Sequence, residues 1–497
     1  MPDSTAEHTR IANVHPPAWD NPPAKDKYHL VVIGGGTAGL VTAAIAAGLG
    51  ATTALLERHW MGGDCLNVGC VPSKAFIRSA RAWHAAATAQ ERFGGPAVAG
   101  QRDFAAVVRR MQRIRSAMSV VDSAERFRDL GVDVFFGQAR FSDRETVTIE
   151  GRNLRFRRAV IATGTRPAVP AIPGLAETGY LTNETIFSMA EVPRRLVVIG
   201  GGPIGSELAQ AFARFGSTVT VLERGERILG NDDPEAAGIV AAALVRDGVR
   251  LLTAVSIRSV KRRQSIIVHL SRGGRTEELE ADAILVASGR MPNVEDLGLD
   301  AAGVEHDQTK VITDDRLRTS NHRVYAAGDI TGLAPFTHVA DAHARMVVQN
   351  ALFFGRKKAS RLVIPWCTYT HPELAHVGMK WEALQAAGDE FSSVTIPLHE
   401  VDRARLDGDD EGFLRVHLRE GSDQIVAATL VGNHAGDIAG QFSMAITHGL
   451  GLSAIGATIF PYPTVAEVIR KSADTWRKRK LTPRVQSLFR LFFRVVR

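Results

Sequence analysis

Cysteine is scarce in this chain, with three among 497 residues. That excludes a structural disulfide framework and favours a reducing compartment, so we expect a cytoplasmic protein. Long apolar runs are also missing: residues 39–50 have only the length of a buried helix and are interrupted by glycines, so they are not a membrane span. Residues 1–27 are polar and proline-rich without an apolar run. They are not a signal peptide, and we expect a disordered leader.

Acidic residues are missing from residues 477–497, which hold eight Lys/Arg, and this segment accounts for the formal charge of +7. The rest of the chain is nearly neutral, which argues against nucleic-acid binding. Residues 481–497 predict a basic amphipathic helix after Pro483. A peripheral membrane contact would suit it, and docking on the protein's own dimer is the alternative. The apolar face would carry Val485, Leu488, Phe489, Phe492 and Val496, and the basic face Arg490, Arg494 and Arg497.

Two of the three cysteines, Cys65 and Cys70, lie five positions apart in a glycine-rich segment that continues to Lys74. On a regular helix they would be separated by roughly 7.5 Å, beyond the roughly 7 Å limit for a disulfide. The flanking glycines and Pro72 predict instead that a loop turns into a helix here. A helix N-terminus with Lys74 one turn later lowers a thiol pKa. We therefore favour a redox-active disulfide over half a zinc site with His59 or two unrelated buried thiols.

A nucleotide-binding pattern occurs twice in the chain. In each copy a short apolar strand runs into a glycine turn, a helix follows, and a second strand ends in Leu-Glu-Arg, its glutamate 23 positions after the first glycine. The glycines allow a tight turn, a close approach of the backbone to a pyrophosphate and close helix packing, and the carboxylate suits a ribose hydroxyl. The first copy contains Gly34, Gly36, Gly39 and Glu57, and the second Gly200, Gly202, Gly205 and Glu223.

With these motifs the chain resembles the flavin-dependent pyridine nucleotide–disulfide oxidoreductases, among them dihydrolipoamide dehydrogenase, glutathione reductase and mercuric reductase. The likeness covers residues 27–474 and includes further segments in family order: 159–167, 287–293, 324–329 and 369–378. It implies an α/β fold with two Rossmann-like dinucleotide-binding domains, for FAD and NAD(P), and a C-terminal α+β domain that forms a homodimer. The implied domains are residues 28–165 with 290–360 (FAD), 166–289 (NAD(P)), 361–475 (dimerisation) and 476–497 (tail).

The resemblance also implies the roles of individual residues. Cys70 would face the flavin, Cys65 would exchange with the acceptor, and Lys74 with Glu207 would form an ion pair beside the flavin. Besides the glycine turns and their glutamates, FAD would contact Thr163, Gly164 and Asp329, and NAD(P) would contact Gly289. Cys367 reads as a core thiol, and the histidines show no metal-ligand spacing, so we expect no metal site.

The choice of nicotinamide dinucleotide depends on Glu223. A carboxylate there accepts a free ribose 2′-hydroxyl and repels a 2′-phosphate, which favours NADH. Arg224 and Arg227 could partly offset that charge, so NADPH is the alternative.

One segment departs from the disulfide-reducing members, whose histidine in a His-Pro-Thr-x-x-Glu motif serves the partner subunit's thiols as acid and base. Here Glu467 is retained, but Tyr462 replaces the histidine. A phenol titrates near 10 and is a poor base at neutral pH. Mercuric reductases resemble this chain better because they also have a tyrosine there, although no cysteine pair follows Cys367 here. We also expect no counterpart of their N-terminal metal-binding domain.

We therefore predict an NAD(P)H-dependent flavoprotein oxidoreductase that passes electrons through the Cys65–Cys70 disulfide to a small electrophilic or thiol acceptor, as a mercuric reductase does. A lipoamide-type or other small-disulfide reductase is one alternative. A membrane-docked electron-transfer or redox-sensing flavoprotein is the other.

Overall fold

A parallel sheet organises the first nucleotide unit, built on the short apolar strands that the sequence marks. The computed structural model describes residues 4–97, 100 and 102–496. The parallel strands run in the order β3-β2-β1-β6-β16, and β5 and β4 continue antiparallel from the first half of β6. Their bounds are β1 Tyr28–Ile33, β2 Thr53–Glu57, β3 Val132–Phe136, β4 Arg140–Phe141, β5 Thr146–Ile149, β6 Arg152–Ile161 and β16 Val324–Ala326.

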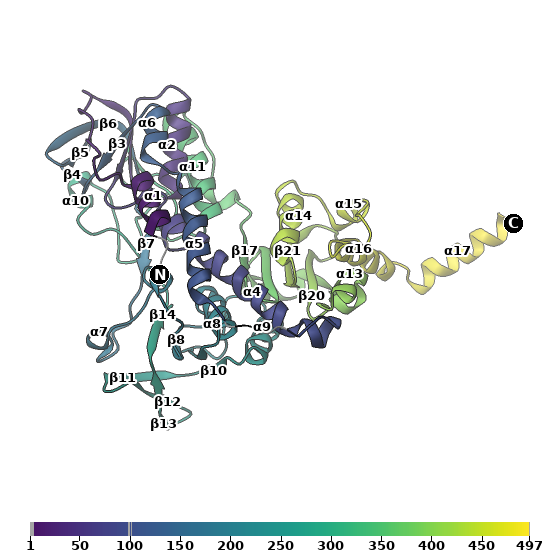
Figure 1. Cartoon of the computed structure of the whole chain (residues 1–497). Coiled ribbons are helices and arrows are strands. Elements are labelled where there is room, and N and C mark those ends of the chain that lie inside the picture. The colour runs from purple at the N-terminus through teal and green to yellow at the C-terminus, as the bar shows by residue number, and fades with distance from the viewer. Residues whose placement is uncertain (1–3, 98–99, 101, 497) are drawn as a thin grey trace.

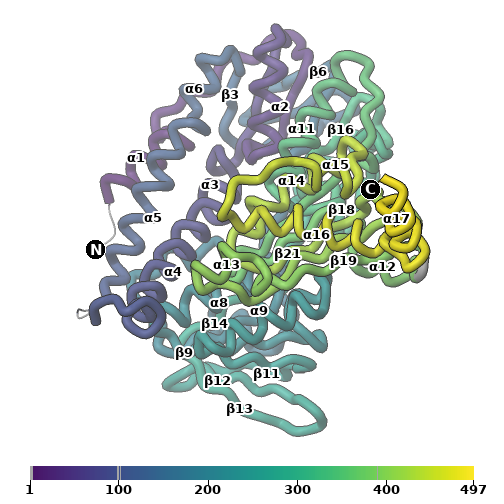
Figure 2. The backbone as a smooth tube through the Cα atoms, turned by 90° about the vertical axis from the view of Figure 1, so that its right-hand side faces the viewer, coloured from purple at the N-terminus to yellow at the C-terminus, as the bar shows by residue number. Residues whose placement is uncertain are grey.

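The chain leaves this unit and returns to it, since β16 comes from residues 324–326. Helices α2 (Thr37–Gly48) and α11 (Thr337–Leu352) pack against each other beside the sheet (Figures 1 and 2). Buried aliphatic side chains cover both faces of the sheet, as expected for parallel strands.

The second nucleotide unit repeats this design in a four-stranded parallel sheet of order β10-β9-β8-β14. An antiparallel sheet, β11-β12-β13, extends from it, and β7 pairs with β15 between the units. The strands are β7 Thr165–Pro167, β8 Arg195–Ile199, β9 Thr218–Leu222, β10 Arg250–Leu252, β11 Ser256–Arg262, β12 Ile266–Arg272, β13 Arg275–Ala281, β14 Ala283–Val286 and β15 Arg290–Pro292. The helices of this unit are α7 Leu175–Thr178, α8 Pro203–Phe215 and α9 Pro234–Arg246. The short helix α10, Leu299–Ala302, belongs to the first unit, where it packs against β4.

The two units share one strand register. Leu30 of β1 pairs with Thr53 of β2, and Arg195 of β8 pairs with Thr218 of β9, an offset of 23 residues in both cases. The same offset separates each first glycine from its glutamate, so each carboxylate lies beside its glycine turn. The sequence repeat is therefore a structural repeat, which confirms the predicted pair of Rossmann-like units.

A five-stranded antiparallel sheet of order β17-β18-β21-β20-β19 forms the third lobe, which completes the predicted α/β plus α+β architecture (Figure 1). Its strands are β17 Pro365–Thr368, β18 Glu373–Gly378, β19 Phe391–Pro397, β20 Phe413–Arg419 and β21 Ile425–Gly432. Its helices are α12 Trp381–Ala387, α13 Asp402–Asp407, α14 Ala435–Thr447, α15 Leu452–Gly456 and α16 Glu467–Arg479. The exact domain boundaries stay a prediction.

A phenylalanine cluster joins the two nucleotide units. The helices between β2 and β3 are α3 (Gly63–Asn67), α4 (Cys70–Phe93), α5 (Phe104–Ser119) and α6 (Ala124–Asp129). Phe76 of α4 packs edge-on against Phe187 and Phe215 of the second unit, with ring centroids 5.4 and 5.9 Å apart. Such aromatic contacts bury large apolar surfaces and prefer this geometry. They hold α4 against α8.

The expected disordered leader is wrong for the residues that the structure describes; residues 1–3 lie outside them. Ser4–Val14 form helix α1, which packs on α5. Arg10 is only 2% exposed and lies between Glu7 (2.5 Å) and Asn67 (2.5 Å), while Arg115 of α5 also reaches Glu7 at 2.7 Å. Because charge pairs rather than an apolar run hold this helix, the polar composition was misleading.

The predicted basic amphipathic helix is confirmed as α17, Pro483–Val495, with Pro483 in its first turn. Thr482 caps it by accepting a hydrogen bond from the backbone N–H of Val485 at 3.4 Å. Within the described ranges, no helix is both long and apolar enough to cross a membrane.

We expect Arg10→Ala to destabilise the protein by about 1–3 kcal/mol, because the change removes the buried hydrogen bonds of Arg10 to Glu7 and to the Asn67 side-chain oxygen and leaves Arg115 alone to hold Glu7. Thermal unfolding should begin several degrees lower, and hydrogen exchange should rise in α1 and α3. His8→Ala, on the exposed side of the same helix, is the matched control and should change neither. If the two variants had the same unfolding temperature and the same hydrogen exchange, the Arg10 contacts would not be what holds α1 in place.

Candidate active site

The two thiols lie at a break between two helices. Cys65 is in the one-turn helix α3, and Cys70 is the first residue of α4. Gly69 makes the break, and a Cβ atom there would lie 2.8 Å from the carbonyl oxygen of Asp64. Lys74 follows one turn after Cys70, as predicted. Both thiols are free in this structure.

Backbone contact ties this break to the first glycine turn. Gly63, which begins α3, has a positive φ of 54°, and a Cβ there would lie 2.6 Å from the Cα of Gly36. Only glycine fits so close an approach. The dithiol is therefore held beside the turn that would bind a pyrophosphate.

The electrostatics separate the two thiols. The hydrogen bond from the Cys65 thiol lowers the pKa of Cys70 to about 6 against the effect of burial, and the Thr337 hydroxyl and the Lys74 charge act in the same direction. The Thr337 oxygen lies 3.2 Å from the Cys70 sulfur. The same thiol–thiol hydrogen bond, together with burial, raises the pKa of Cys65 well above its usual range. These opposite shifts favour Cys70 over Cys65 as the thiolate of the reduced pair.

Three parts of the fold meet at one carboxylate. Glu207 of α8 accepts from the Lys74 ammonium at 2.8 Å and from the backbone N–H of Tyr369 at 2.8 Å. Burial alone would lower the pKa of Lys74, but Glu207 raises it above the usual value. The Lys74 nitrogen also lies 4.8 Å from the centre of the Tyr369 ring. The lysine thus stays charged near Cys70.

The third cysteine lies near the same lysine. Cys367 is half-buried in β17, and burial raises the pKa of its thiol well above the usual range. Lys74 and Glu207 are among the charges that act on it. Its sulfur packs against Gly436, where an added Cβ atom would lie 3.2 Å from it. A neutral, packed thiol of this kind is typical of a core residue.

Both glycine turns fit a dinucleotide. Gly34 and Gly200 have φ of 107° and 110°, and a Cβ on either would come within 2.4 Å of a backbone oxygen at the end of the neighbouring strand. Gly39 and Gly205 pack equally closely on the carbonyls of those first glycines. A Cβ at Gly202, in contrast, would meet no protein atom within 4 Å. Helices α2 and α8 begin there without side-chain caps, so their N–H groups are available to a pyrophosphate.

Each predicted ribose carboxylate also supports its own turn. Glu57 accepts from the backbone N–H of Gly35 at 2.6 Å and of His59 at 2.7 Å. Glu223 accepts from Gly201 and Gly225, both at 2.6 Å. Burial raises the pKa of Glu57 although both hydrogen bonds oppose it.

Polar residues from distant segments surround Asp329. Its carboxylate accepts from the Thr165 hydroxyl at 3.1 Å, and burial raises its pKa while the nearby Arg290 opposes the rise. Arg290 donates to the Thr165 hydroxyl at 2.6 Å and also pairs with Asp64, next to Cys65. Arg290 thereby connects the Asp329 site to the dithiol segment. Arg290 directly follows Gly289 in the sequence, and this neighbouring position is the signal by which sequence reasoning could have found it.

The crossover between the nucleotide units is closed by reciprocal hydrogen bonds. The Thr163 hydroxyl donates to the carbonyl of Asn293 at 2.9 Å, and the Asn293 amide donates to the carbonyl of Thr163 at 2.8 Å. Gly164 accepts from the Asn293 backbone at 3.0 Å, and Gly289 accepts from the Ala168 backbone at 2.9 Å. These contacts bring the segments that carry Thr163, Gly164 and Gly289 together.

Tyr462 and Glu467 lie in the third lobe, and among the described residues no hydrogen bond or ion pair joins either to the dithiol of the same chain. Tyr462 is 69% exposed and donates to Asp402 at 3.0 Å, which raises its pKa further. Glu467 is buried; one carboxylate oxygen accepts from Arg470 at 2.6 Å, and the other has no partner. The contact of Tyr462 with the dithiol of a partner subunit, which the resemblance implies, stays a prediction.

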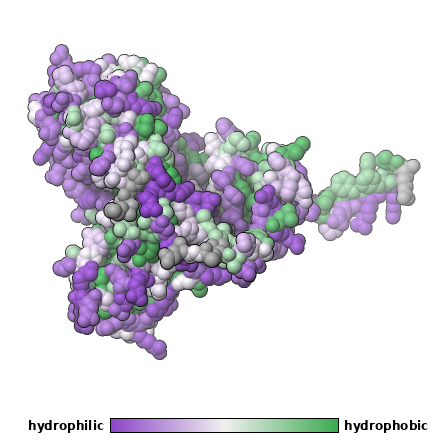
Figure 3. Space-filling view, viewed as in Figure 1, coloured by the Kyte–Doolittle hydropathy of each residue, from purple (hydrophilic) through white to green (hydrophobic). Residues whose placement is uncertain are grey.

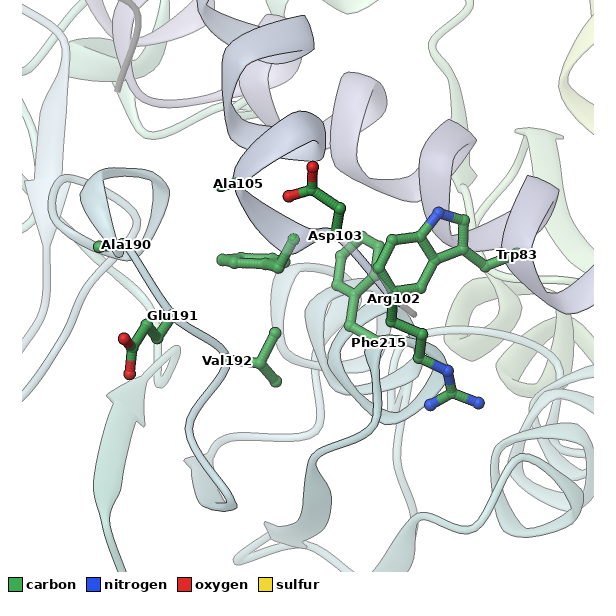
Figure 4. A pocket seen from close by; sticks show the side chains of 9 residues that line it. Trp83, Arg102, Asp103, Ala105, Ala190, Glu191, Val192 and Phe215 are labelled. Atoms are coloured by element: carbon green, nitrogen blue, oxygen red, sulfur yellow. The ribbon is translucent and has the colours of Figure 1, made fainter. Parts of the chain in front are cut away.

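The described part of the chain contains no group of three or more His, Cys, Asp or Glu residues arranged to hold a metal ion. A pocket of about 620 Å³ lies far along α4 from the thiols (Figure 4). Trp83 and Phe215 line it, while Glu191 points away from them. Trp83 follows Cys70 by about 20 Å of helix, so this pocket is separate from the dithiol.

Comparison with known proteins gives concordant matches. Residues 28–352 match the family described as pyridine nucleotide-disulphide oxidoreductase, and residues 364–473 match its dimerisation domain. The mercuric reductase of Staphylococcus aureus is 34% identical over 91% of this chain and 83% of that protein. The dihydrolipoyl dehydrogenase of Bacillus subtilis is 29% identical over 90% of this chain and 97% of that protein.

A solved structure has the same fold. The HOCl-induced flavoprotein disulfide reductase RclA of Escherichia coli aligns with a TM-score of 0.81 and 27% identity, over 90% of this chain and 99% of its own. A Cu(II) complex of that protein aligns with a TM-score of 0.80.

Thr337→Val should raise the pKa of Cys70 by about one pH unit, because the variant removes a hydroxyl that stabilises the thiolate. The rate at which iodoacetamide alkylates Cys70 in the reduced protein, followed against pH by mass spectrometry, reports this pKa. Thr337→Ser keeps the hydroxyl and should leave the profile near that of the wild type. An unchanged profile in the valine variant would remove Thr337 from the site.

Proposed function

Because the chain belongs to the pyridine nucleotide–disulphide oxidoreductase family, we propose that it is an NADH-dependent flavoenzyme whose Cys65–Cys70 dithiol reduces a soft metal ion, with Hg(II) as the leading acceptor. The family's cofactors are FAD and NAD(P)H, and its dimerisation domain supports a homodimer. The observation that carries the choice of acceptor is the bonding of Tyr462.

The first unit would hold FAD through Gly34, Gly36 and Gly39, with Glu57 at the ribose, and through Thr163, Gly164 and Asp329. The second would hold the nicotinamide dinucleotide through Gly200, Gly202, Gly205 and Gly289, with Glu223 at the ribose. When bound, FAD supplies a two-electron relay between reduced nicotinamide and a disulfide.

The side chains around the dithiol stabilise negative charge. The Lys74 ammonium favours the thiolate of Cys70 and any further anionic charge that develops beside it. Glu207 holds the lysine in place, and its buried carboxylate is satisfied by the same contact. Cys65 stays protonated in the reduced pair, and we assign it the exchange with the acceptor.

Tyr462 is ill suited to disulfide chemistry. A dithiol that attacks a small disulfide needs a base near neutral pH, and the Asp402 hydrogen bond moves this phenol still further from neutrality. A soft metal ion displaces thiol protons as its sulfur bonds form, so those protons leave without a dedicated base. This difference favours the metal ion.

The net reaction balances when the solvent supplies one proton. NADH gives up a hydride, which carries two electrons and one proton. With one more proton from water, a Hg(II) bis-thiolate becomes Hg(0) and two free thiols. The Cu(II) complex of the E. coli relative supports metal ions as a wider acceptor class.

A small-disulfide reductase is the second candidate, favoured by the dihydrolipoyl dehydrogenase relative. A dithiol that reports redox poise to a protein partner is the third. A peripheral membrane contact through residues 481–497 is a separate proposal, because nothing in the dithiol chemistry requires it. The cytoplasmic location stays a prediction.

We expect the NADH-reduced holoenzyme to turn over Hg(II)-thiolate about 10²-fold or more faster than lipoamide or glutathione disulfide, since the disulfides lack their base. Steady-state assays with these acceptors, Cu(II) and a quinone measure the ratio. Cys65→Ser should abolish the Hg(II) reaction, and Cys367→Ser should retain it. Rapid lipoamide turnover would favour the disulfide reductase, and no turnover with any acceptor would favour the sensor.

Tyr462→His provides the matched variant for the same assay. Imidazole titrates near neutral pH, and the unpartnered oxygen of Glu467 would be available to orient it. Disulfide turnover should therefore rise about tenfold or more while Hg(II) turnover changes little. Tyr462→Phe should give no rise. If both variants behave alike, the missing base is not the barrier.

The preference for NADH rests on charges around Glu223. Arg227 donates from Nη2 to the backbone carbonyls of Gly230 (2.6 Å) and Asp232 (3.0 Å), which holds that nitrogen away from a 2′-phosphate. Arg224 is exposed. The Glu223 carboxylate, held at the glycine turn, is the charge that we infer to disfavour NADPH.

Glu223→Ser should lower the ratio of kcat/KM for NADH to that for NADPH by about tenfold, because the change removes the repulsion of a 2′-phosphate. Initial rates at varied NADH and NADPH give this ratio. Glu226→Ser removes the same charge from an exposed position three residues on and should change the ratio far less. A similar fall in both variants would point to diffuse charge instead.

A further inference from the structure

Helix α17 stands apart from the rest of the molecule. It projects from the end of the third lobe, beyond α16 (Figure 1). None of its residues is buried. Phe489, Phe492 and Phe493 are 49%, 55% and 65% exposed. An exposed apolar surface of this kind marks a place where something else binds.

The helix has a wide apolar face and a narrow polar one. At 100° per residue, the apolar side chains cover an arc of about 200°, and Gln486, Ser487, Arg490 and Arg494 occupy about 100° opposite. Arg484, in the first turn, falls near one edge of the apolar arc. Figure 3 shows this division as green and purple sides along the helix. A helix that packs on one protein surface needs a stripe of only about 100°. The apolar residues are Val485, Leu488, Phe489, Leu491, Phe492, Phe493, Val495 and Val496.

The charge around the helix is of one sign. The last turn of α16 contains Arg477, Lys478 and Arg479, and Lys480 follows it. Residues 477–497 hold no acidic side chain that could neutralise them. Basic residues next to an apolar helix complement an anionic lipid surface and reinforce its hydrophobic binding.

The length of the helix decides how it would bind. Thirteen residues rise about 20 Å, less than the roughly 30 Å of a bilayer core. The helix would therefore lie in the plane of the interface, with its apolar face among the acyl chains and its arginines at the headgroups.

From these observations we propose that α17, with the basic end of α16, docks the protein on an anionic membrane surface. The match to the dimerisation domain ends at residue 473, before α17 begins, so the family interface does not account for this helix. Two such helices in a homodimer would strengthen binding by avidity. The proposal does not depend on which acceptor the dithiol reduces.

The test uses the full-length holoenzyme and co-sedimentation with vesicles. We expect binding to equimolar phosphatidylcholine and phosphatidylglycerol, and weak binding to phosphatidylcholine alone. Phe489→Ala with Phe492→Ala should reduce binding about tenfold or more, because two apolar anchors are lost. Gln486→Ala with Ser487→Ala makes two neutral changes on the polar face and should leave binding within about twofold.

Charge and self-association are tested separately. Arg490→Gln with Arg494→Gln should reduce binding to the anionic vesicles about tenfold and weaken its salt dependence. All variants should retain wild-type NADH oxidation, since among the described residues no hydrogen bond or ion pair joins α17 to the dithiol site. Absent vesicle binding, or binding insensitive to the phenylalanine changes, would overturn the proposal. So would a lipid-free assembly larger than a dimer that those changes dissociate, because a second copy would then cover the helix.

Discussion

The buried carboxylate of Glu207 is the contact on which the arrangement of the site depends. Glu207 belongs to the second nucleotide unit. Its carboxylate accepts one hydrogen bond from the Lys74 ammonium of the first unit and one from the backbone N–H of Tyr369 in the third lobe. A buried carboxylate without these partners would be costly, so all three parts must meet for it to be satisfied. Packing of Phe76 against Phe187 and Phe215 supplies the apolar surface that makes the meeting favourable. The Glu207–Lys74 ion pair thus serves both the electrostatics of the dithiol site and the packing of the three lobes.

The dithiol is positioned from both sides of its helix break. The close approach of Gly63 to Gly36 fixes it against the first glycine turn. On the other side, Arg10 and Arg115 both bind Asn67, the last residue of the helix that carries Cys65. The N-terminal helix that looked like a disordered leader is therefore part of the support for the redox pair.

Tyr462 links the chemistry to the choice of acceptor. Its hydroxyl is engaged by Asp402, and Glu467 keeps a buried oxygen without a partner. The segment retains a carboxylate that would orient an imidazole but has no imidazole. This combination is the reason why we propose a thiol-reactive metal ion as the acceptor, and the chain is similar to mercuric reductases.

Patterns within about 25 residues were enough to predict both strand–turn–helix units, the helix break at the dithiol and the amphipathic helix, because local backbone geometry and hydrophobic periodicity specify them. Contacts between distant residues were not predictable. Thr337 reaches Cys70 across 267 positions, Arg290 reaches Asp64 across 226, and Arg115 holds Glu7 across 108. These polar contacts become favourable only where folding removes water around them. No local sequence pattern therefore predicts which residues will form them.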